Sequence, residues 1–274
     1  MDLNTIDSIL DKANPAARKH WDQIGRDSQM YTVALFALSA SPQGDILTLA
    51  GTGTLVADGT AHYILTAAHV WHEVLKQADK LGISLRENVD HRCLMDIATI
   101  VPSGPAKAHS WNEWGPDLIF LRIPEVRVGE IEAFRVFYGL GTGKQVPLKG
   151  EHIQTYLLVG TPHVLGTFEQ NHAGVHIMGF WVGLPTYHTH EGLDYFDARA
   201  SFPPPSNAKS FGGVSGGGLW KVQIYGEASS DKIASRATLE GVAFYEVNVA
   251  DGTGTIRCHG PESIRLALLN LKTA

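Results

Sequence analysis

The stretch ILTLAGTGTLVA (46–57) and its neighbour HYILTA (62–67) decide the fold class of this 274-residue chain. Both are short runs rich in apolar and β-branched residues, and the polar turn ADGTA (57–61) separates them. Such runs on either side of a short polar turn are typical of a β-hairpin. The run YTVALFA (31–37) precedes them across the turn SPQGD (41–45) and predicts a further strand.

The rest of the chain continues this pattern. Strand-like runs follow at DIATIVP (96–102), DLIFLRIP (117–124), IQTYLLVG (153–160), GVHIMGFWVG (174–183), GLWKVQIY (218–225) and LEGVAFYEV (239–247). Helical spacing of apolar residues is found at Ile6, Ile9, Leu10 and Ala13, after Pro15, roughly from His69 to Leu81, and after Pro261.

These patterns predict an all-β chain in two similar halves with helical ends. We place the first half at residues 29–135 and the second, with the closing helix, at 136–274. Residues 1–28 form a helical appendage, which either packs on the outside of the β-structure or docks a partner.

Composition narrows the class of protein. The formal charge is −6, from 22 basic and 28 acidic residues, and this balance argues against nucleic-acid binding. There is neither a basic start followed by an apolar stretch nor an apolar run of membrane-spanning length, so we expect neither a secretory signal nor a membrane contact. Two cysteines, Cys93 and Cys258, cannot form a disulfide framework, and we therefore expect a cytoplasmic protein.

Three segments carry residues that suit nucleophilic catalysis. They contain His69 at the end of a strand-like run, Asp117 at the start of another, and Ser215 within FGGVSGGG (211–218). A serine hydroxyl needs a base such as His69, and the imidazole needs a carboxylate that holds it in one tautomer. The backbone amides of Gly213 and Ser215, in a glycine-rich turn, would bind the oxyanion.

The carboxylate has a second candidate. Asp96 also begins a strand-like run and lies 27 residues after His69, whereas Asp117 lies 48 residues after it. We favour Asp117, because a solvated, charged turn follows its strand-like run DLIFLRIP (117–124).

The boxes TAAHV (66–70) and GVSGG (213–217) resemble those of the chymotrypsin/trypsin-like serine peptidases, most closely the intracellular bacterial branch. The resemblance covers about Gly51 to about Val247. It implies two packed antiparallel β-barrels with the triad of His69, Asp117 and Ser215 in the cleft between them. It also implies an endopeptidase that acts on protein or peptide substrates and needs no cofactor.

The resemblance has departures that bear on control and specificity. Val214 replaces the aspartate that binds a newly cut N-terminus in digestive members, which suggests control by a protein partner, a loop or substrate supply. Lys209 stands where the base of the specificity pocket is expected, and a buried ammonium there would favour acidic substrate side chains. Glu246 stands at the pocket wall beside Phe244 and Tyr245, and a Lys209–Glu246 pair could neutralise or close the pocket. The alternative function is therefore a catalytically silent binding module with an occluded cleft.

Two other motifs are weaker. His188 and His190, with Glu191 nearby, could suggest a metal site. No third ligand can be placed beside the two histidines, however, and a solvated loop is the better interpretation. GLGTGK (139–144) fails as a phosphate loop, because Tyr138 and Gln145 occupy positions that require glycine and Ser or Thr. We therefore expect a turn between the two halves there.

Overall fold

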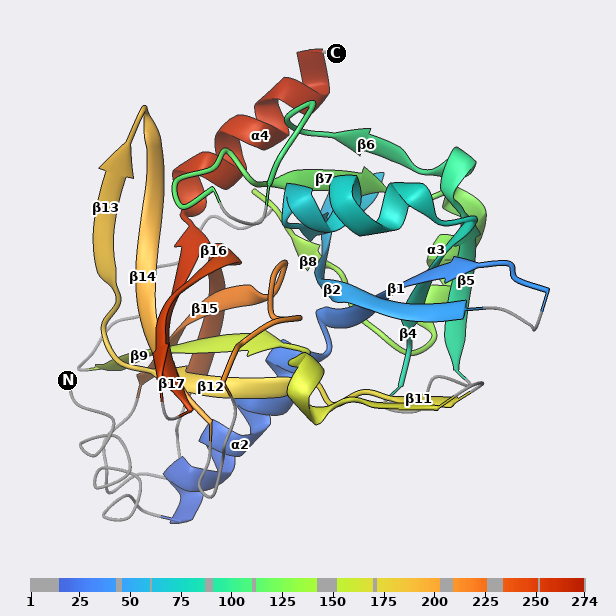
Figure 1. Cartoon of the computed structure of the whole chain (residues 1–274). Helices are drawn as coiled ribbons and strands as arrows, with labels where there is room; N and C mark the ends of the chain where they lie inside the picture. Colours follow the sequence, from blue (N-terminus) through green and yellow to red (C-terminus); the bar gives the residue numbers. More distant parts are fainter. Residues whose placement is uncertain are drawn as a thin grey trace.

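The computed structural model describes residues 15–42, 46–59, 61–86, 91–109, 112–141, 152–169, 172–202, 209–225, 234–250 and 252–273. The first expected helix, with Ile6, Ile9, Leu10 and Ala13, lies outside these residues, as does the second half of the expected turn at 139–144. The described chain forms two large, mainly antiparallel sheets that lie side by side (Figure 1), which confirms the predicted all-β fold. No helix in the described ranges is long and apolar enough to cross a membrane.

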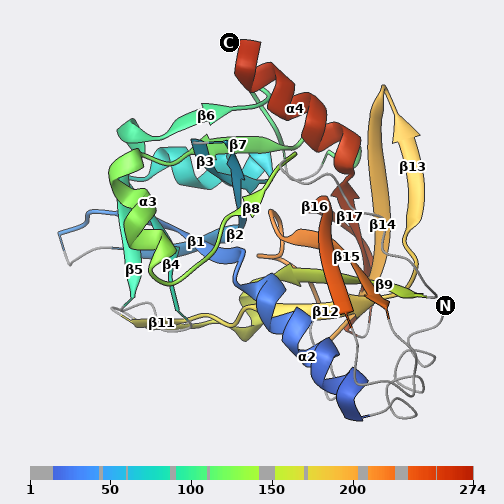
Figure 2. The same ribbon diagram turned by 180° about the vertical axis from the view of Figure 1, so that it is seen from behind.

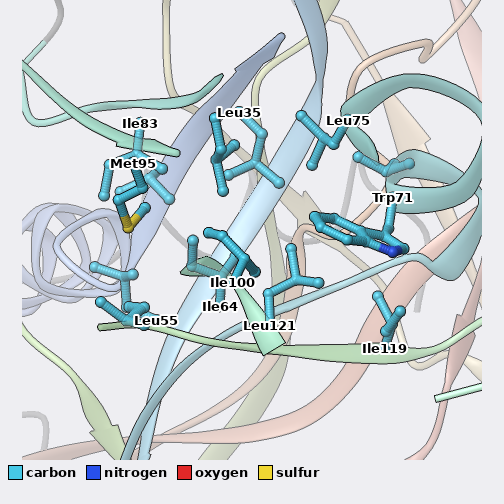
Figure 3. Close-up of a cluster of buried hydrophobic side chains, with 14 of the residues drawn as sticks. Leu35, Leu55, Ile64, Trp71, Leu75, Ile83, Met95, Ile100, Ile119 and Leu121 are labelled. Atoms are coloured by element: carbon cyan, nitrogen blue, oxygen red, sulfur yellow. The ribbon is translucent and has the colours of Figure 1, made fainter. Parts of the chain in front are cut away.

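The first sheet has the strand order β5-β4-β1-β2-β3-β7-β6, with β8 paired to β2. Its strands are β1 (Thr32–Ser39), β2 (Ile46–Asp58), β3 (Ala61–Thr66), β4 (Lys80–Ser84), β5 (Arg92–Asp96), β6 (Val101–Ser103), β7 (Ile119–Arg122) and β8 (Tyr138–Gly139). The strands β2 and β3 form the predicted hairpin, with Thr54 opposite Leu65 and Asp58 opposite Ala61. The sheet curls around an apolar interior, in which Leu35, Leu55, Ile64, Ile83 and Leu121 converge (Figure 3).

The second sheet has the order β12-β9-β15-β16-β17-β14-β13. Its strands are β9 (His152–Gly160), β12 (Met178–Val182), β13 (Thr186–His190), β14 (Leu193–Ser201), β15 (Gly218–Tyr225), β16 (Ala234–Ala250) and β17 (Thr253–His259). A separate two-stranded sheet pairs β10 (Thr167–Glu169) with β11 (His172–Gly174). Side chains from β9, β12, β14 and β17 meet in one buried cluster, so this sheet also encloses its own core.

A third apolar cluster joins the two sheets. Val56, Leu65 and Phe120 from the first sheet meet Leu157, Val159, Trp220 and Val242 from the second. The helices α2 (Pro15–Gln29) and α4 (Pro261–Thr273) add Trp21, Ile24 and Ile264 to it. In the two opposite views, α2 lies along the second sheet and α4 lies over one end of both sheets (Figures 1 and 2). The halves are therefore held together by a buried apolar interface, and Trp21 and Ile24 belong to it.

The helix expected from His69 to Leu81 is shorter than predicted. Two short helical segments, η1 (Val70–Val74) and η2 (Leu75–Gln77), are followed by the strand β4. Leu81 and Ile83 pair with β1 and β5, so pairing between strands overrides the local helical spacing. Trp71 and Leu75 from the helical segments point into the first core (Figure 3).

Three further boundaries differ from the sequence reading. The strand β8 pairs with β2 at Val56 and Ala57, so the first sheet extends four residues past the predicted limit at 135. DIATIVP (96–102) begins at the last residue of β5 and continues as a short helical turn, η3 (Ile97–Thr99), and β6. The helix α3 (Glu125–Glu132) stands where a charged turn was expected after β7, because Val128 and Ile131 on one of its faces are buried.

Candidate active site

The register between β3 and β7 places His69 beside Asp117. These strands are antiparallel neighbours, and Thr66 at the end of β3 lies opposite Ile119 at the start of β7. His69 follows Thr66 by three residues and Asp117 precedes Ile119 by two, so both side chains emerge at the same end of the sheet. His69 and Asp117 therefore lie close together although they are 48 residues apart in the sequence, because the pairing of β3 with β7 sets the distance between them.

Asp117 holds His69 by two contacts. The His69 backbone N–H donates to Asp117 Oδ1 at 2.7 Å, and His69 Nδ1 lies 2.6 Å from Asp117 Oδ2. The carboxylate is 1% exposed, and the imidazole is 12% exposed. An ionised carboxylate only accepts hydrogen bonds, so Nδ1 carries the proton and Nε2 is left as the base. Asp96 lies exposed at the end of β5, so the geometry favours Asp117 over this alternative.

The backbone of Asp117 is held by a second histidine. The Asp117 N–H donates to His259 Nε2 at 3.1 Å. His259 ends β17 and is 1% exposed, and its ring stacks on Phe244 with the centroids 4.3 Å apart. Burial lowers the pKa of His259 to about 3, so its imidazole is neutral and accepts this hydrogen bond at ordinary pH. Sequence reasoning missed His259, because no motif surrounds it and its partner is 142 residues away.

The loop before Asp117 is fixed to the second sheet by Arg257. Its guanidinium lies over the ring of Trp114, 3.8 Å from the centroid, and donates to both carboxylate oxygens of Asp197 at 2.7 and 2.9 Å. It also donates to Glu113 at 2.8 Å. A planar guanidinium suits such a bidentate and stacked site, so it positions the segment that leads to Asp117.

Ser215 lies in a tight turn in which every peptide carbonyl from residue 211 to 217 accepts a hydrogen bond. Four of the donors are backbone amides within the turn or on β16 and the segment after β9; they bond the carbonyls of Phe211, Gly212, Val214 and Gly217. The other three donors come from β2. Thr52 N–H donates to Ser215 O at 2.8 Å, Thr52 Oγ1 to Gly213 O at 2.6 Å, and Thr54 Oγ1 to Gly216 O at 3.0 Å.

The amides of the same turn divide into two groups. Those of Phe211, Gly212, Val214, Gly216 and Gly217 all donate to protein acceptors. Within the described chain, the N–H groups of Gly213 and Ser215 donate to none. Two amides of one turn that have no protein acceptor are available to bind an anion, and an oxyanion requires such donors. The structure thus brings together the two predicted donors.

The glycines of this turn are required by its conformation. Gly213 has a φ of 91° and Gly216 a φ of 92°, which residues with a side chain rarely adopt. A Cβ at Gly216 would collide with Thr52 O and Thr66 Oγ1, and one at Gly213 with Thr161 O and the His163 ring.

His69 and Ser215 line one cavity of about 470 Å³ between the sheets. Its wall includes Gly213, and no hydrogen bond joins Ser215 Oγ to His69 in the described structure. Such a bond is often long or misaligned in the absence of substrate, so the shared cavity is the relevant observation. His163, which the sequence reading did not single out, also lines the cavity, and partial burial lowers the pKa of its imidazole.

The predicted specificity residues are only partly brought together. Phe244, Tyr245 and Glu246 line the cavity, as expected. Lys209 is exposed and lies outside the lining, so the prediction of a buried ammonium at the pocket base is wrong. The physical reason is Phe211, two residues on, whose ring packs against Phe180 and Phe202.

Glu246 also has partners other than the expected lysine. Its carboxylate accepts from Ser210 Oγ at 3.0 Å and from Phe211 N–H at 2.7 Å. These contacts tie β16 to the start of the turn at 211–217 and keep a negative charge at the cavity wall.

The β16 strand offers an unpaired edge beside the cavity. Its pairing with β15 ends at Val242, opposite Gly218, and beyond that point Tyr245, Glu246 and Val247 pair only with β17 in the described sheet. An extended peptide could add to this free edge.

The residues of the suspected metal motif lie elsewhere. His188 and His190 belong to β13, so the expected solvated loop is a strand paired with β14. His188 Nε2 contacts Asp197 Oδ2 at 3.1 Å, and His190 packs on Trp114. Among the residues that the structure describes, no three His, Cys, Asp or Glu side chains gather as metal ligands would.

Comparison with models of known protein families gives no match for this chain, and comparison with curated proteins gives none either.

Proposed function

We propose that this chain is a serine endopeptidase that cleaves peptide bonds of protein substrates through an acyl-enzyme intermediate. The single observation that carries the proposal is the pair of unbonded amides at Gly213 and Ser215, in the same cavity as the bonded pair of His69 and Asp117. An oxyanion site and an oriented base around one serine are the parts that acyl transfer needs.

In this proposal Ser215 Oγ attacks the substrate carbonyl, and His69 Nε2 takes its proton. The amides of Gly213 and Ser215 bind the oxyanion that forms. His69 then gives the proton to the leaving amine, and water hydrolyses the ester by the same route in reverse. Asp117 keeps His69 in the tautomer that has its free nitrogen toward Ser215, and stabilises the imidazolium.

The free edge of β16 supports a peptide as the substrate, since an extended backbone can pair with Tyr245 to Val247 and bring a carbonyl to the oxyanion site. Glu246 places a carboxylate on the cavity wall, which favours a basic substrate side chain over an acidic one. Cys93 and Cys258 are buried free thiols, which supports a cytoplasmic site of action.

The test is labelling with a fluorophosphonate, read by intact mass, on the wild type, Ser215→Ala and His69→Ala. We expect one adduct on the wild type and none on Ser215→Ala. His69→Ala should react at least ~100-fold more slowly, because its serine lacks a base. An unlabelled wild type, or a labelled Ser215→Ala, would refute the proposal.

A second candidate is a silent binding module whose cleft is occluded. It is favoured by the bonds of Glu246 to Ser210 and Phe211, which join two walls of the cavity. The same experiment separates the two, since an occluded site gives no adduct on the wild type. Glu246→Ala would then restore labelling if this side chain is what closes the cleft.

A further inference from the structure

We infer that Thr52 is a positioning residue, whose hydroxyl holds the oxyanion turn in its working conformation from the neighbouring sheet. The turn is then formed by the fold itself, and neither a cut N-terminus nor an activating partner is needed to order it. The role in catalysis rests on the proposed function, whereas the role in ordering the turn does not.

The Thr52 side chain is the centre of a compact network. Its Oγ1 donates to Gly213 O at 2.6 Å and accepts the Thr161 N–H at 2.9 Å. Thr161 Oγ1 lies 2.9 Å from the same oxygen and 3.3 Å from Gly213 O. The Thr52 hydroxyl on β2 thus links Thr161, which follows β9, to the Gly213 carbonyl in the turn at 211–217.

The backbone of Thr52 is fixed as well. Its N–H donates to Ser215 O at 2.8 Å, and its carbonyl accepts from Thr66 Oγ1 at 2.7 Å. Thr52 and Thr66 are fully buried and Thr161 is 1% exposed. Water cannot replace these bonds without a rearrangement, so loss of the hydroxyl would leave Gly213 O with a poorer partner.

Peptide planarity explains how this network sets the oxyanion donors. The Gly213 N–H belongs to the peptide whose carbonyl, Gly212 O, accepts from His163 N–H at 2.7 Å. The next peptide has its carbonyl, Gly213 O, on Thr52 and its amide, Val214 N–H, on Phe211 O at 3.0 Å. Because both peptide planes that flank Gly213 are held, its conformation is fixed, and its amide, which has no acceptor in the described chain, belongs to a residue that lines the cavity.

Val214 gives this turn no charge with which to form an ion pair. Its side chain is 1% exposed and packs in the core of the second sheet, against Gly160. A buried ammonium beside this isopropyl group would have no counter-charge. The turn is therefore ordered by hydrogen bonds and not by an ion pair at this position, and Thr52 supplies the shortest of those that come from the other sheet.

The experiment compares Thr52→Val, Thr52→Ser and the matched control Thr155→Val with the wild type. Thr52→Val keeps the shape and removes the hydroxyl, whereas Thr52→Ser keeps the hydroxyl. Thr155 is a buried threonine of β9 whose hydroxyl donates to Val182 O at 3.3 Å, away from the turn. Thr161→Val is a milder variant of the network, because the Thr161 N–H still reaches Thr52.

Two readouts are taken on each full-length variant after its folding is checked by circular dichroism. Hydrogen exchange of peptides spanning residues 209–225 reports the order of the turn. The rate of fluorophosphonate labelling reports the oxyanion site. We expect Thr52→Val to exchange faster in this segment and to label about 10- to 100-fold more slowly, since one oxyanion donor is misplaced. Thr52→Ser and Thr155→Val should stay within about threefold of the wild type in labelling, and Thr161→Val should fall between.

The outcomes separate the two proposals. Unchanged exchange and labelling in Thr52→Val would overturn the role of Thr52 and leave the peptidase standing. Faster exchange in Thr52→Val with no labelling of the wild type would support the ordering role and refute the peptidase. A wild type that shows no protection of the turn until a partner is added would overturn the inference of a preformed site. If Thr52→Val does not fold, Thr161→Val decides by the same readouts, and wild-type exchange and labelling in that variant would overturn the role of the network.

Discussion

Acidification should lower the free energy of unfolding, because His259 is neutral in the folded protein. This is the histidine that accepts a hydrogen bond from the Asp117 N–H. The folded protein keeps this imidazole neutral down to about pH 3, because charging it would require a buried cation. In the unfolded chain it binds a proton below its ordinary pKa of 6.5. Between these values the unfolded state holds more protons, so the free energy of unfolding falls as the pH falls and is unaffected by this group above 6.5.

The size of the effect follows from the separation of the two pKa values. Each pH unit within the window costs about 1.4 kcal/mol. From pH 7.5 to pH 5, protonation of this one group in the unfolded state therefore lowers the free energy of unfolding by about 2 kcal/mol. That is a large share of the stability of an ordinary domain.

The assay is urea unfolding at pH 7.5 and pH 5, followed by tryptophan fluorescence and circular dichroism, on the wild type and His259→Gln. The glutamine carbonyl can still accept the Asp117 N–H but does not titrate. Stacking on Phe244 is lost, so the variant should be less stable at pH 7.5. Its further loss on going to pH 5 should nevertheless be smaller than that of the wild type by about 2 kcal/mol. The exposed His176, changed to glutamine, controls for the loss of one imidazole. Equal losses in the wild type and His259→Gln would refute the reasoning.

Three further predictions concern the cavity. Asp117→Asn should lower kcat by about 10³- to 10⁴-fold with an unchanged fold by circular dichroism, because His69 would take the wrong tautomer; a loss below tenfold would contradict this. Glu246→Gln should reduce the preference for peptides with a basic over a neutral residue before the cleaved bond by about 3- to 10-fold, measured as kcat/KM, since an exposed charge is partly screened; an unchanged ratio would exclude Glu246 as a specificity residue. Gly216→Ala should lower the free energy of unfolding by more than about 2 kcal/mol, from its positive φ and the clash with Thr52 O; wild-type stability in urea would show that the turn can shift without cost.

Local sequence patterns were sufficient for most of the fold. The hairpin of β2 and β3 follows from two β-rich runs around a polar turn, and α2 and α4 follow from a proline and an apolar stripe. The segment after His69 could not be predicted in this way. The sequence predicts one helical stretch from roughly His69 to Leu81, but Leu81 pairs with β1 and β5, and those partners lie outside any local window.

Local motifs likewise predict part of the candidate site, whereas the rest depends on strand pairing. His69, Ser215 and the glycines of the turn stand in short motifs, so their chemistry could be predicted without coordinates. The choice between Asp117 and Asp96 could not be made from their spacing. It depends on the pairing of β3 with β7, which brings only Asp117 to the imidazole.

By itself, the sequence determined the residue types of the proposed triad, the donors of the oxyanion turn and the all-β class, because each depends on neighbours within a few positions. Only the tertiary structure decided which groups hold them. Thr52 lies 161 residues from Gly213 and His259 lies 142 residues from Asp117. Lys209 faces solvent while Glu246 lines the cavity, although both were candidates for the same pocket. These assignments depend on how the two curled sheets pack together. A hydrogen bond between residues so far apart in the sequence produces no local pattern from which it could be predicted.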